Sequence, residues 1–430
     1  MKNWSGVEKW TPAEVLYPTS EAAIQQIVKN ALDRKKKIRI IGSGHSFTQL
    51  CVTDDVLISL DHFQGLTAVD QQSCQATVKG GTRLKHLGEL LYSQGLGMEN
   101  LGDIDTQSIA GTISTGTHGT GISLGTISTQ VKAIRFVNGL GEIVNCSETE
   151  LPSLFKAAQV SLGVLGIITE VTLQCVPAYK LKMVYEKGVL NDLLLNYQAI
   201  NRDTRNFECF WLPYTKYVLR KSASITQEPI DKIGLGSILQ EYILENMAFK
   251  VLCEMAYYFP SKNKWVSEIA ASTLGHHVKR AYSHHIYATI RAVKFNEMEY
   301  SVPYEAYPEV MKAVQKSFDK HQFKVHFPIE NRFVKGDDIY LSPAYGRDSA
   351  YIACHVYYKK PFKEYFKILE DIFKAYDGRP HWGKLHTLTA HELNERYPKM
   401  GLFLEHQANQ DPENLFVSPY LNSLLFPFQT

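Results

Sequence analysis

The sequence lacks any apolar run long enough to cross a bilayer. Its most apolar stretch, Met247–Phe259, is interrupted by Lys250 and Glu254. That stretch falls short of the roughly 20 apolar residues that a spanning helix needs. The N-terminus carries no apolar signal segment. From these absences we expect a cytoplasmic protein without a transmembrane segment.

Cysteine pairs and a charge imbalance are also missing. The seven cysteines are odd in number and include no Cys-x-x-Cys motif, so neither a disulfide framework nor a structural zinc site is predicted. The 46 Lys and Arg residues nearly balance the 44 Asp and Glu residues. The resulting net charge of +2 favours neither nucleic acid nor an anionic membrane as the main partner.

Two histidine pairs, His276-His277 and His284-His285, are the residues best suited to hold a metal ion. No carboxylate or cysteine stands at a typical ligand spacing from them. Adjacent residues on a strand also point to opposite faces, which would separate the two rings of a pair. The sequence therefore predicts no metal site.

What the sequence does contain is a chain of 430 residues, long enough for two domains, with a glycine turn near its start. The strand Ile38–Ile41 runs into Gly42-Ser43-Gly44-His45-Ser46. Glycine lets the backbone approach a ligand closely, and exposed backbone N–H groups in such a turn can hold a phosphate. A plain tight turn explains the same residues, so this motif alone leaves both interpretations open.

Residues 103–121 differ from their surroundings. Glycine and hydroxyl residues dominate, and almost nothing is charged after Asp105. A flexible linker has a similar composition. The isoleucines and the histidine of this segment, and its position between ordered elements, favour instead a wall of N–H and O–H donors along an elongated polar ligand such as a diphosphate.

Helices and strands alternate over the rest of the first half. Ser20 predicts the N-cap of one helix, and Thr82 the N-cap of a second helix that stops at Gly95. The strand candidates are Val56–Leu60, Leu66–Val69, Ala76–Val78, a hairpin of Val131–Val137 with Glu142–Val144, and Ile167–Cys175. A short helix is predicted over Leu151–Gln159, and we place a domain boundary after Pro177.

The second half becomes regular only from residue 293. Before that point the pattern gives helical stretches at 190–200, 235–255 and 262–272 and a strand-like Phe207–Leu212. After it we predict, in order, a strand Val293–Val302, a helix from Pro303, strands Phe323–Val334 and Ala350–Tyr358, a helix from Pro361 and a strand near Trp382. This β-α-β-β-α-β order is typical of a ferredoxin-like unit.

Polar residues gather in this second half. Glu330 and Arg332 stand two apart on a predicted strand and so share one face of the sheet. His355 lies in the next strand, and Lys384 lies between tryptophan, glycine and leucine. The face is either solvated, as alternating strands usually are, or it lines a cavity that holds a polar substrate.

Four motifs together resemble the vanillyl-alcohol-oxidase-type (PCMH-type) flavoproteins, and most closely the sugar-1,4-lactone and alditol oxidases. They are Gly42-Ser43-Gly44-His45-Ser46, the run 108–121, Ser161–Ile168 and His381-Trp382-Gly383-Lys384-Leu385-His386. The resemblance implies an α+β protein with two domains. These would be a PCMH-type FAD-binding domain over residues 1–177 and a ferredoxin-like substrate (cap) domain over 178–380, with a C-terminal segment, 381–430, that returns to the FAD domain and the active site.

The resemblance also implies an FAD cofactor bonded covalently through its 8α-methyl group to His45. The residues that match the family's other FAD contacts are Ile41, Gly42, Ser43, Gly44 and Ser46, then Ser108, Ser114, Gly116, Thr117, His118 and Gly119, and finally Gly163, Gly166 and Ile168. Relatives with a second, cysteinyl link carry that cysteine near residues 106–110. This chain has none between Cys74 and Cys146, which argues against the berberine-bridge-type branch.

On the substrate side, the residues that match the family are Glu330, Arg332, His355 and Lys384, with Ser108 shared between flavin and substrate. In such enzymes a hydride passes from carbon to flavin while the hydroxyl proton leaves. Lys384 or His355 would accept or steer that proton. Arg332 would stabilise negative charge on the reduced flavin, and Glu330 would bind substrate hydroxyls.

We therefore expect an FAD-dependent oxidase that acts on a polyol or an aldono-1,4-lactone and reduces O2 to H2O2, as a monomer or a small homo-oligomer. Two other reactions fit the same fold: a dehydrogenase that passes electrons to a cytochrome or quinone, and a cytokinin-type amine oxidase. A flavin-free binding protein that uses the same pocket is the alternative outside the enzymes.

Overall fold

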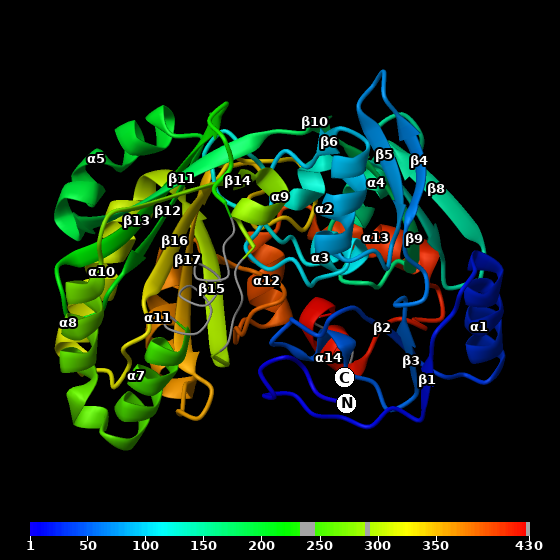
Figure 1. The fold of residues 1–430 in the computed structure, drawn as a ribbon. Helices are drawn as coiled ribbons and strands as arrows, with labels where there is room; N and C mark the ends of the chain where they lie inside the picture. The colour runs from blue at the N-terminus through cyan, green and yellow to red at the C-terminus, as the bar shows by residue number, and fades with distance from the viewer. Residues whose placement is uncertain (233–245, 289–292, 427–430) are drawn as a thin grey trace.

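The computed structural model describes residues 1–232, 246–288 and 293–426. Over these ranges the chain forms two lobes that lie side by side (Figure 1). The first lobe contains a three-stranded and a five-stranded sheet, and the second lobe is built on one eight-stranded sheet. Helices accompany all of them, so the α+β fold class is confirmed. None of the described helices has the length and apolarity that a membrane crossing requires.

The small sheet of the first lobe consists of parallel strands in the order β1 (Glu14–Leu16), β3 (Val56–Ser59), β2 (Ile38–Ile41). Helix α1 (Glu21–Asp33) begins where the sequence predicts, because the Ser20 side chain accepts a hydrogen bond from the Ala23 N–H at 3.2 Å. Its apolar stripe, Ile24, Val28 and Ala31, is buried.

The larger sheet of the first lobe is antiparallel, in the order β4-β5-β9-β7-β8. Its strands are β4 (Leu66–Asp70), β5 (Gln75–Lys79), β7 (Val131–Val137), β8 (Ile143–Ser147) and β9 (Ile167–Gln174), so the predicted hairpin is confirmed. The helices of this lobe are α2 (Leu84–Ser93), α3 (Ile109–Ser114) and α4 (Pro152–Ala158). Two short strands, β6 (Leu96–Gly97) and β10 (Val176–Pro177), pair with each other.

The prediction of Thr82 as a helix cap is wrong. The N-cap of α2 is Arg83, and no side chain caps it. The Thr82 hydroxyl instead donates to the Lys79 carbonyl at 2.7 Å and accepts from the Gly65 N–H at 2.9 Å. Thr82 thus closes the turn after β5, since a threonine hydroxyl stabilises a turn as readily as a helix start.

The eight-stranded sheet, called the cap sheet below, has the order β14-β11-β13-β12-β16-β17-β15-β18. Its strands are β11 (Lys180–Val189), β12 (Asn206–Trp211), β13 (Tyr217–Thr226), β14 (His277–Tyr282), β15 (Phe295–Pro303), β16 (Ile329–Val334), β17 (Ser349–Tyr357) and β18 (Arg379–Pro380). Its helices are α5 (Leu190–Asp203), α7 (Asn246–Tyr258), α8 (Asn263–Thr273), α9 (Ser283–Ile286), α10 (Tyr307–His321) and α11 (Lys363–Ala375).

The cap sheet contains the ferredoxin-like unit twice. Strands β15 to β18, with α10 and α11, make the predicted unit, and their spatial order is fourth-first-third-second. Strands β11 to β14 repeat that order, which the sequence did not reveal. The two units join along β12 and β16. Helices α5, α7, α8, α10 and α11 lie on the outer side of the sheet, so its inner face turns toward the first lobe (Figure 1).

Two predicted boundaries in the second half are wrong by at least four residues. Pro303 ends β15, and α10 begins four residues later, after a 3₁₀ turn at Tyr304–Ala306. Strand β16 begins only at Ile329, because Pro328 has no N–H to donate to the ladder. Residues 235–245 of the helix predicted at 235–255 lie outside the described residues, and residues 246–255 are helical in α7, as predicted.

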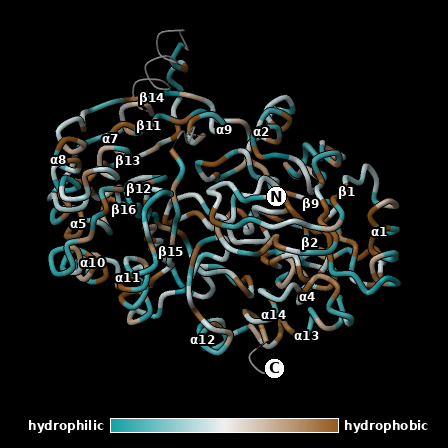
Figure 2. The backbone as a smooth tube through the Cα atoms, turned by 90° about the horizontal axis from the view of Figure 1, so that it is seen from below, coloured by the Kyte–Doolittle hydropathy of each residue, from teal (hydrophilic) through white to brown (hydrophobic). Residues whose placement is uncertain are grey.

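After the cap sheet the chain returns to the first lobe through α12 (Ala390–Arg396), α13 (Met400–Gln410) and α14 (Pro419–Leu425). The Leu415 carbonyl accepts a hydrogen bond from the Ile38 N–H at 2.9 Å. Seen from below, β2 and β9 lie on one side of the molecule with α13 and α14, and β12 and β16 lie on the other (Figure 2). The site described next lies between these two sides.

Candidate active site

The glycine turn after β2 lies directly against the start of α3. A Cβ atom on Gly42 would lie 2.5 Å from the Ser108 Oγ atom, so a side chain there would push the Ser108 hydroxyl out of its place. Gly44 has a φ of +68°, in the left-handed region that favours glycine. Glycine is therefore favoured at both positions, and the two segments predicted to form a ligand wall do meet.

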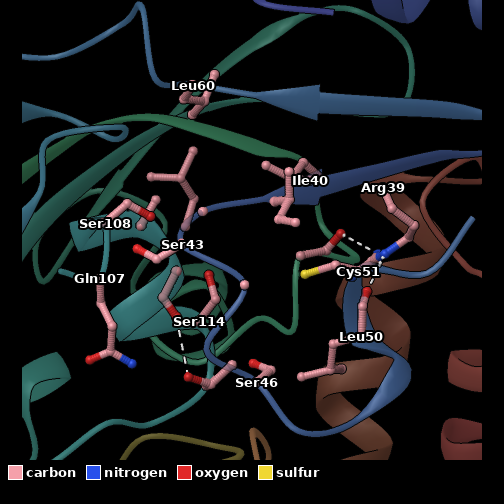
Figure 3. Close-up of a pocket in the computed structure, with 18 of the residues that line it drawn as sticks. Arg39, Ile40, Ser43, Ser46, Leu50, Cys51, Leu60, Gln107, Ser108 and Ser114 are labelled. Carbon is pink, nitrogen blue, oxygen red and sulfur yellow. Dashed lines mark hydrogen bonds between the residues drawn. The ribbon is translucent and has the colours of Figure 1, made fainter. Parts of the chain in front are cut away.

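A cavity lined by both segments runs along this contact (Figure 3). The predicted cofactor residues that line it are Ile41, Gly42, Ser43, Gly44, His45, Ser46, Ser108, Ser114, Gly163, Gly166 and Ile168. Gly116, Thr117, His118 and Gly119 are not among the lining residues. Further lining residues escaped the sequence prediction although they adjoin its motifs: Arg39, Ile40, Leu50, Cys51, Leu60, Asp61, Gly81, Gln107, Ala110, Gly111, Thr115 and Leu162.

Arg39 lies at one end of the cavity, opposite Ser43 and Ser108 (Figure 3). Its buried guanidinium donates to the carbonyls of Leu50, Leu162, Gly163 and Phe416 at 2.5 to 3.1 Å. Burial lowers its pKa to about 10, so it stays charged at neutral pH. A cation beside a glycine-lined cavity suits an anionic, elongated ligand, and a dinucleotide such as FAD fits these residues.

His45 lies at the other end of the turn, toward the second lobe. Its ring stacks on Trp4 with centroids 5.6 Å apart, and its Nε2 atom lies 2.9 Å from the Thr106 hydroxyl. Burial, followed by the charges of Lys384 and Arg83, lowers its pKa to about 4. At neutral pH the imidazole is therefore uncharged and keeps a nitrogen lone pair.

His118 is turned away from the cavity. Its Nδ1 atom lies 2.8 Å from the Gly119 carbonyl, and its Nε2 atom lies 3.2 Å from the Glu299 carboxylate of β15. Burial alone would raise the pKa of Glu299, but His118 lowers it to about 2. His118 thus joins the first lobe to the cap sheet, and we assign it a role in holding the two lobes together.

The inner face of the cap sheet carries a row of polar residues that the strand register brings together. Glu208 stands opposite Arg332 across β12 and β16. His355 stands opposite Glu297 across β17 and β15. Residues that face each other across antiparallel strands point to the same side. The register therefore places residues from four strands on one surface.

Arg332 is the centre of the row. Its guanidinium lies 2.6 Å from Glu330, 2.9 Å from Glu208 and 3.3 Å from Asp103. Burial would lower its pKa, but these three carboxylates raise it well above the ordinary value. Burial raises the pKa of Glu330 despite Arg332, while Lys221, 2.9 Å away, and Arg332 keep the pKa of Glu208 below its usual value against burial.

Lys384 and His355 meet at one carboxylate, Glu297. The Lys384 Nζ atom lies 2.5 Å from Glu297 and 5.2 Å from the centre of the Phe47 ring, in the segment that follows the glycine turn. The His355 Nε2 atom lies 3.5 Å from Glu297 and 3.8 Å from Glu330. Burial would raise the pKa of Glu297, but the charge of Lys384 above all holds it below the ordinary range.

The structure thus brings the four predicted substrate-side residues into one cluster and places it beside the glycine turn. The Phe47 N–H donates to the Gly383 carbonyl at 2.7 Å, which fixes the Lys384 loop against that turn. Sequence reasoning missed Glu208, Glu297 and Glu299. The last two stand two apart on a strand, the same spacing that singled out Glu330 and Arg332, so a signal was present.

Comparison with known proteins gives the family of the chain. Residues 171–424 match the family model described as D-arabinono-1,4-lactone oxidase, and residues 12–147 match the FAD binding domain. The L-gulono-1,4-lactone dehydrogenase of Mycobacterium tuberculosis is 36% identical over 99% of both chains. The L-gulonolactone oxidase of Mus musculus is 30% identical over 99% of this chain and 98% of its own.

Solved structures share the fold. A cholesterol oxidase from Brevibacterium sterolicum superposes with a TM-score of 0.82 over 99% of this chain and 96% of its own, at 15% identity. A chitooligosaccharide oxidase superposes with a TM-score of 0.73 over 97% and 93%, at 14% identity. The family model alone spans more than half of the sequence. The chain therefore belongs to the D-arabinono-1,4-lactone oxidase family of FAD-dependent oxidoreductases.

Proposed function

We propose that this protein is an oxidase that converts an alcohol group of an aldono-1,4-lactone, or of a polyol, to a carbonyl group and reduces O2 to H2O2. The observation that carries the proposal is the cluster of Glu297, Glu330, Arg332, His355 and Lys384 beside the glycine turn. Buried charges at this density suit a polyhydroxylated substrate that loses a proton.

FAD, when bound, accepts the hydride and so carries the redox chemistry. We assign residues 1–177 to its binding, through the glycine turn, the start of α3 and the loop before β9. We assign residues 381–430 to the support of this domain, because the Gly383 and Phe416 carbonyls accept hydrogen bonds from the Phe47 N–H and the Arg39 guanidinium. We assign residues 178–380 to covering the substrate with the inner face of the cap sheet.

His355 is best placed to accept the hydroxyl proton. Its Nδ1 atom lies 3.3 Å from the Pro328 carbonyl, which favours the proton on Nδ1 and leaves a lone pair on Nε2. That nitrogen faces the carboxylates of Glu297 and Glu330. Both would stabilise the imidazolium that forms.

Lys384 and Arg332 act as fixed positive charges. Lys384 forms an ion pair with Glu297 at 2.5 Å and can donate hydrogen bonds to substrate oxygens. Arg332 is held between three carboxylates and supplies a charge that needs no rearrangement during the reaction. Glu330 remains close enough to both His355 and Arg332 to bind a substrate hydroxyl between them.

We further propose that His45 is the covalent attachment point of the flavin. Its uncharged ring, at the cavity end nearest Lys384, supports this assignment. In the wild-type protein the flavin should stay with the protein after acid precipitation and fluoresce in a denaturing gel. In His45→Ala the pellet should be colourless; a fluorescent variant band would contradict the tether.

The acceptor is tested by reducing the enzyme without oxygen, with L-gulono-1,4-lactone or D-arabinono-1,4-lactone, and then mixing it with O2. We expect rapid return of the oxidised-flavin absorbance and one H2O2 per flavin. The matching family model is an oxidase model, which supports O2 as the acceptor. A panel of lactones, alditols and amines checks the donor, and turnover of amines alone would contradict it.

A dehydrogenase is the second candidate, because the Mycobacterium tuberculosis relative with that name is 36% identical to this chain. It predicts sluggish reoxidation by O2 and fast reoxidation by a cytochrome c or a quinone in the same experiment. That outcome would keep the proposed donor and remove O2 as the acceptor.

A further inference from the structure

Helix α9 of the second lobe packs against α2 of the first lobe (Figure 1). The contact is close because α2 has a glycine there. A Cβ atom on Gly88 would lie 2.7 Å from the Cβ atom of His284. This approach brings Glu89, the next residue of α2, to the histidine pair His284-His285, which begins two residues after the end of β14.

Three ligand-type side chains converge at this contact. The Glu89 Oε1 atom lies 3.3 Å from Nε2 of His285 and 3.8 Å from Nε2 of His284. One ligand atom from each residue lies within 4.8 Å of the other two. Zinc bonds of about 2.0–2.2 Å in a tetrahedron put neighbouring ligand atoms roughly 3.3–3.6 Å apart, so the observed spacing is close to a coordination geometry.

His284 supplies an independent observation. Its side chain is only 9% exposed, and its Nε2 atom has no hydrogen-bond partner among the described residues. A buried polar atom without a partner costs free energy. A surface ion pair explains Glu89 with the half-exposed His285, but it leaves the buried nitrogen of His284 unsatisfied. A cation between the three residues would satisfy all of them.

We propose that Glu89, His284 and His285 bind one divalent transition-metal ion, with Zn²⁺ as the expected class. Two imidazoles and one carboxylate form a common zinc donor set that leaves a fourth position for water. The ligands come from both lobes, so the ion would lock α2 to α9, at a distance from the reaction itself. The sequence predicts no metal site, because it places the histidines on a strand with no carboxylate nearby. His284 and His285 lie instead on a helix, with ring centroids 4.0 Å apart, and tertiary packing supplies the carboxylate.

The test is titration of the chelator-treated holoenzyme with ZnCl2 by calorimetry. We expect one ion per chain in the wild type. Glu89→Gln and His285→Gln should each weaken the affinity by at least about tenfold, since even outer-shell partners of metal ligands contribute about 10–100-fold. Both side chains are 51% exposed, so these variants should fold. The control is His276→Gln, an exposed histidine that lies 3.6 Å from Glu186 and has no third ligand in the part of the chain that the structure describes, and its affinity should not change.

Two further measurements distinguish a built site from adventitious binding. Electron paramagnetic resonance of bound Cu²⁺ should show coupling to two imidazole nitrogens in the wild type and to one in His285→Gln. Zn²⁺ should raise the Tm of the wild type and not that of Glu89→Gln, because a ligand stabilises only the state that binds it. Equal affinity in wild type and both variants, or several weak sites, would overturn the proposal whatever the substrate of the enzyme.

Discussion

The two sides of the active site are built from different kinds of residue. The first-lobe side uses glycines, hydroxyl residues and backbone groups, with Arg39 at the far end of the cavity. The cap-sheet side uses carboxylates, imidazole, ammonium and guanidinium groups within 2.5 to 3.8 Å of each other. One side is shaped to hold a large ligand, and the other carries the charges that act on a small one.

This difference predicts which substitutions each side of the active site tolerates least. Buried charges are expensive to desolvate, and removal of one partner leaves the other uncompensated. The cap-sheet side is therefore sensitive to loss of a charged or titratable group. Gly42 and Gly44 of the glycine turn carry no such group, but a methyl group at Gly42 would press on the Ser108 hydroxyl. This part of the first-lobe side is therefore sensitive to added volume.

The largest expected effect comes from His355→Gln, which removes the proton acceptor while keeping a polar side chain. We expect kcat to fall by about 10²–10⁴-fold, the usual contribution of general base catalysis. Flavin content should not change, because His355 lies on the cap-sheet side. The control is His391→Gln, whose side chain is 71% exposed on α12. Loss of flavin together with kcat would show that the two sides of the active site do not have separate roles.

The opposite result is expected for Gly42→Ala. The new methyl group would push the Ser108 hydroxyl out of its place on the cavity wall, and overpacking of this kind costs about 1–3 kcal/mol. Flavin binding should weaken by roughly 10–100-fold, as measured by the flavin-to-protein absorbance ratio, while turnover per bound flavin stays close to wild type. Gly401→Ala is the matched control, since its Cβ would meet nothing within 4 Å. Full flavin content in Gly42→Ala would remove the turn from the cofactor site.

The smallest effect concerns His326, which lies behind the cap sheet and contacts neither side of the active site. Burial lowers its pKa to about 3, below the value of about 6.5 in an unfolded chain. The unfolded protein therefore binds the extra proton, and stability falls as the pH drops below about 6.5. His326→Gln should reduce this loss by about 1–2 kcal/mol between about pH 7 and pH 5, as measured by urea unfolding. An unchanged pH dependence would contradict it, and a change in activity per flavin at neutral pH would show that the regions are not independent.

Local patterns in the sequence predicted the parts of the fold that depend on local physics. The strand Ile38–Ile41 and the cap at Ser20 were correct because burial and hydrogen bonding there follow neighbouring residues. Glu330 and Arg332 were found because strand geometry puts residues two apart on one face. The resemblance to a known family pointed to His45 and Lys384, whose proximity no spacing reveals.

Tertiary packing decided what the sequence could not show. Glu208 reaches Arg332 only because two units of the cap sheet join along β12 and β16. The first of these units escaped prediction because its strands β11 and β13 are mostly half-buried and do not alternate clearly between apolar and polar residues. Glu89 meets His284 only where Gly88 lets two helices from different lobes come close.

The junction of the two ferredoxin-like units has a further consequence. In a symmetric dimer of identical subunits, each surface must serve as its own partner, so an acidic residue on one copy is repeated on the other. Here both copies lie in one chain and can change separately. Glu208 comes from the first copy, and Arg332 from the second. The central ion pair of the site thus joins two different residues, an arrangement that a repeated unit within one chain permits. A symmetric homodimer of either unit alone would have to form that pair twice or not at all.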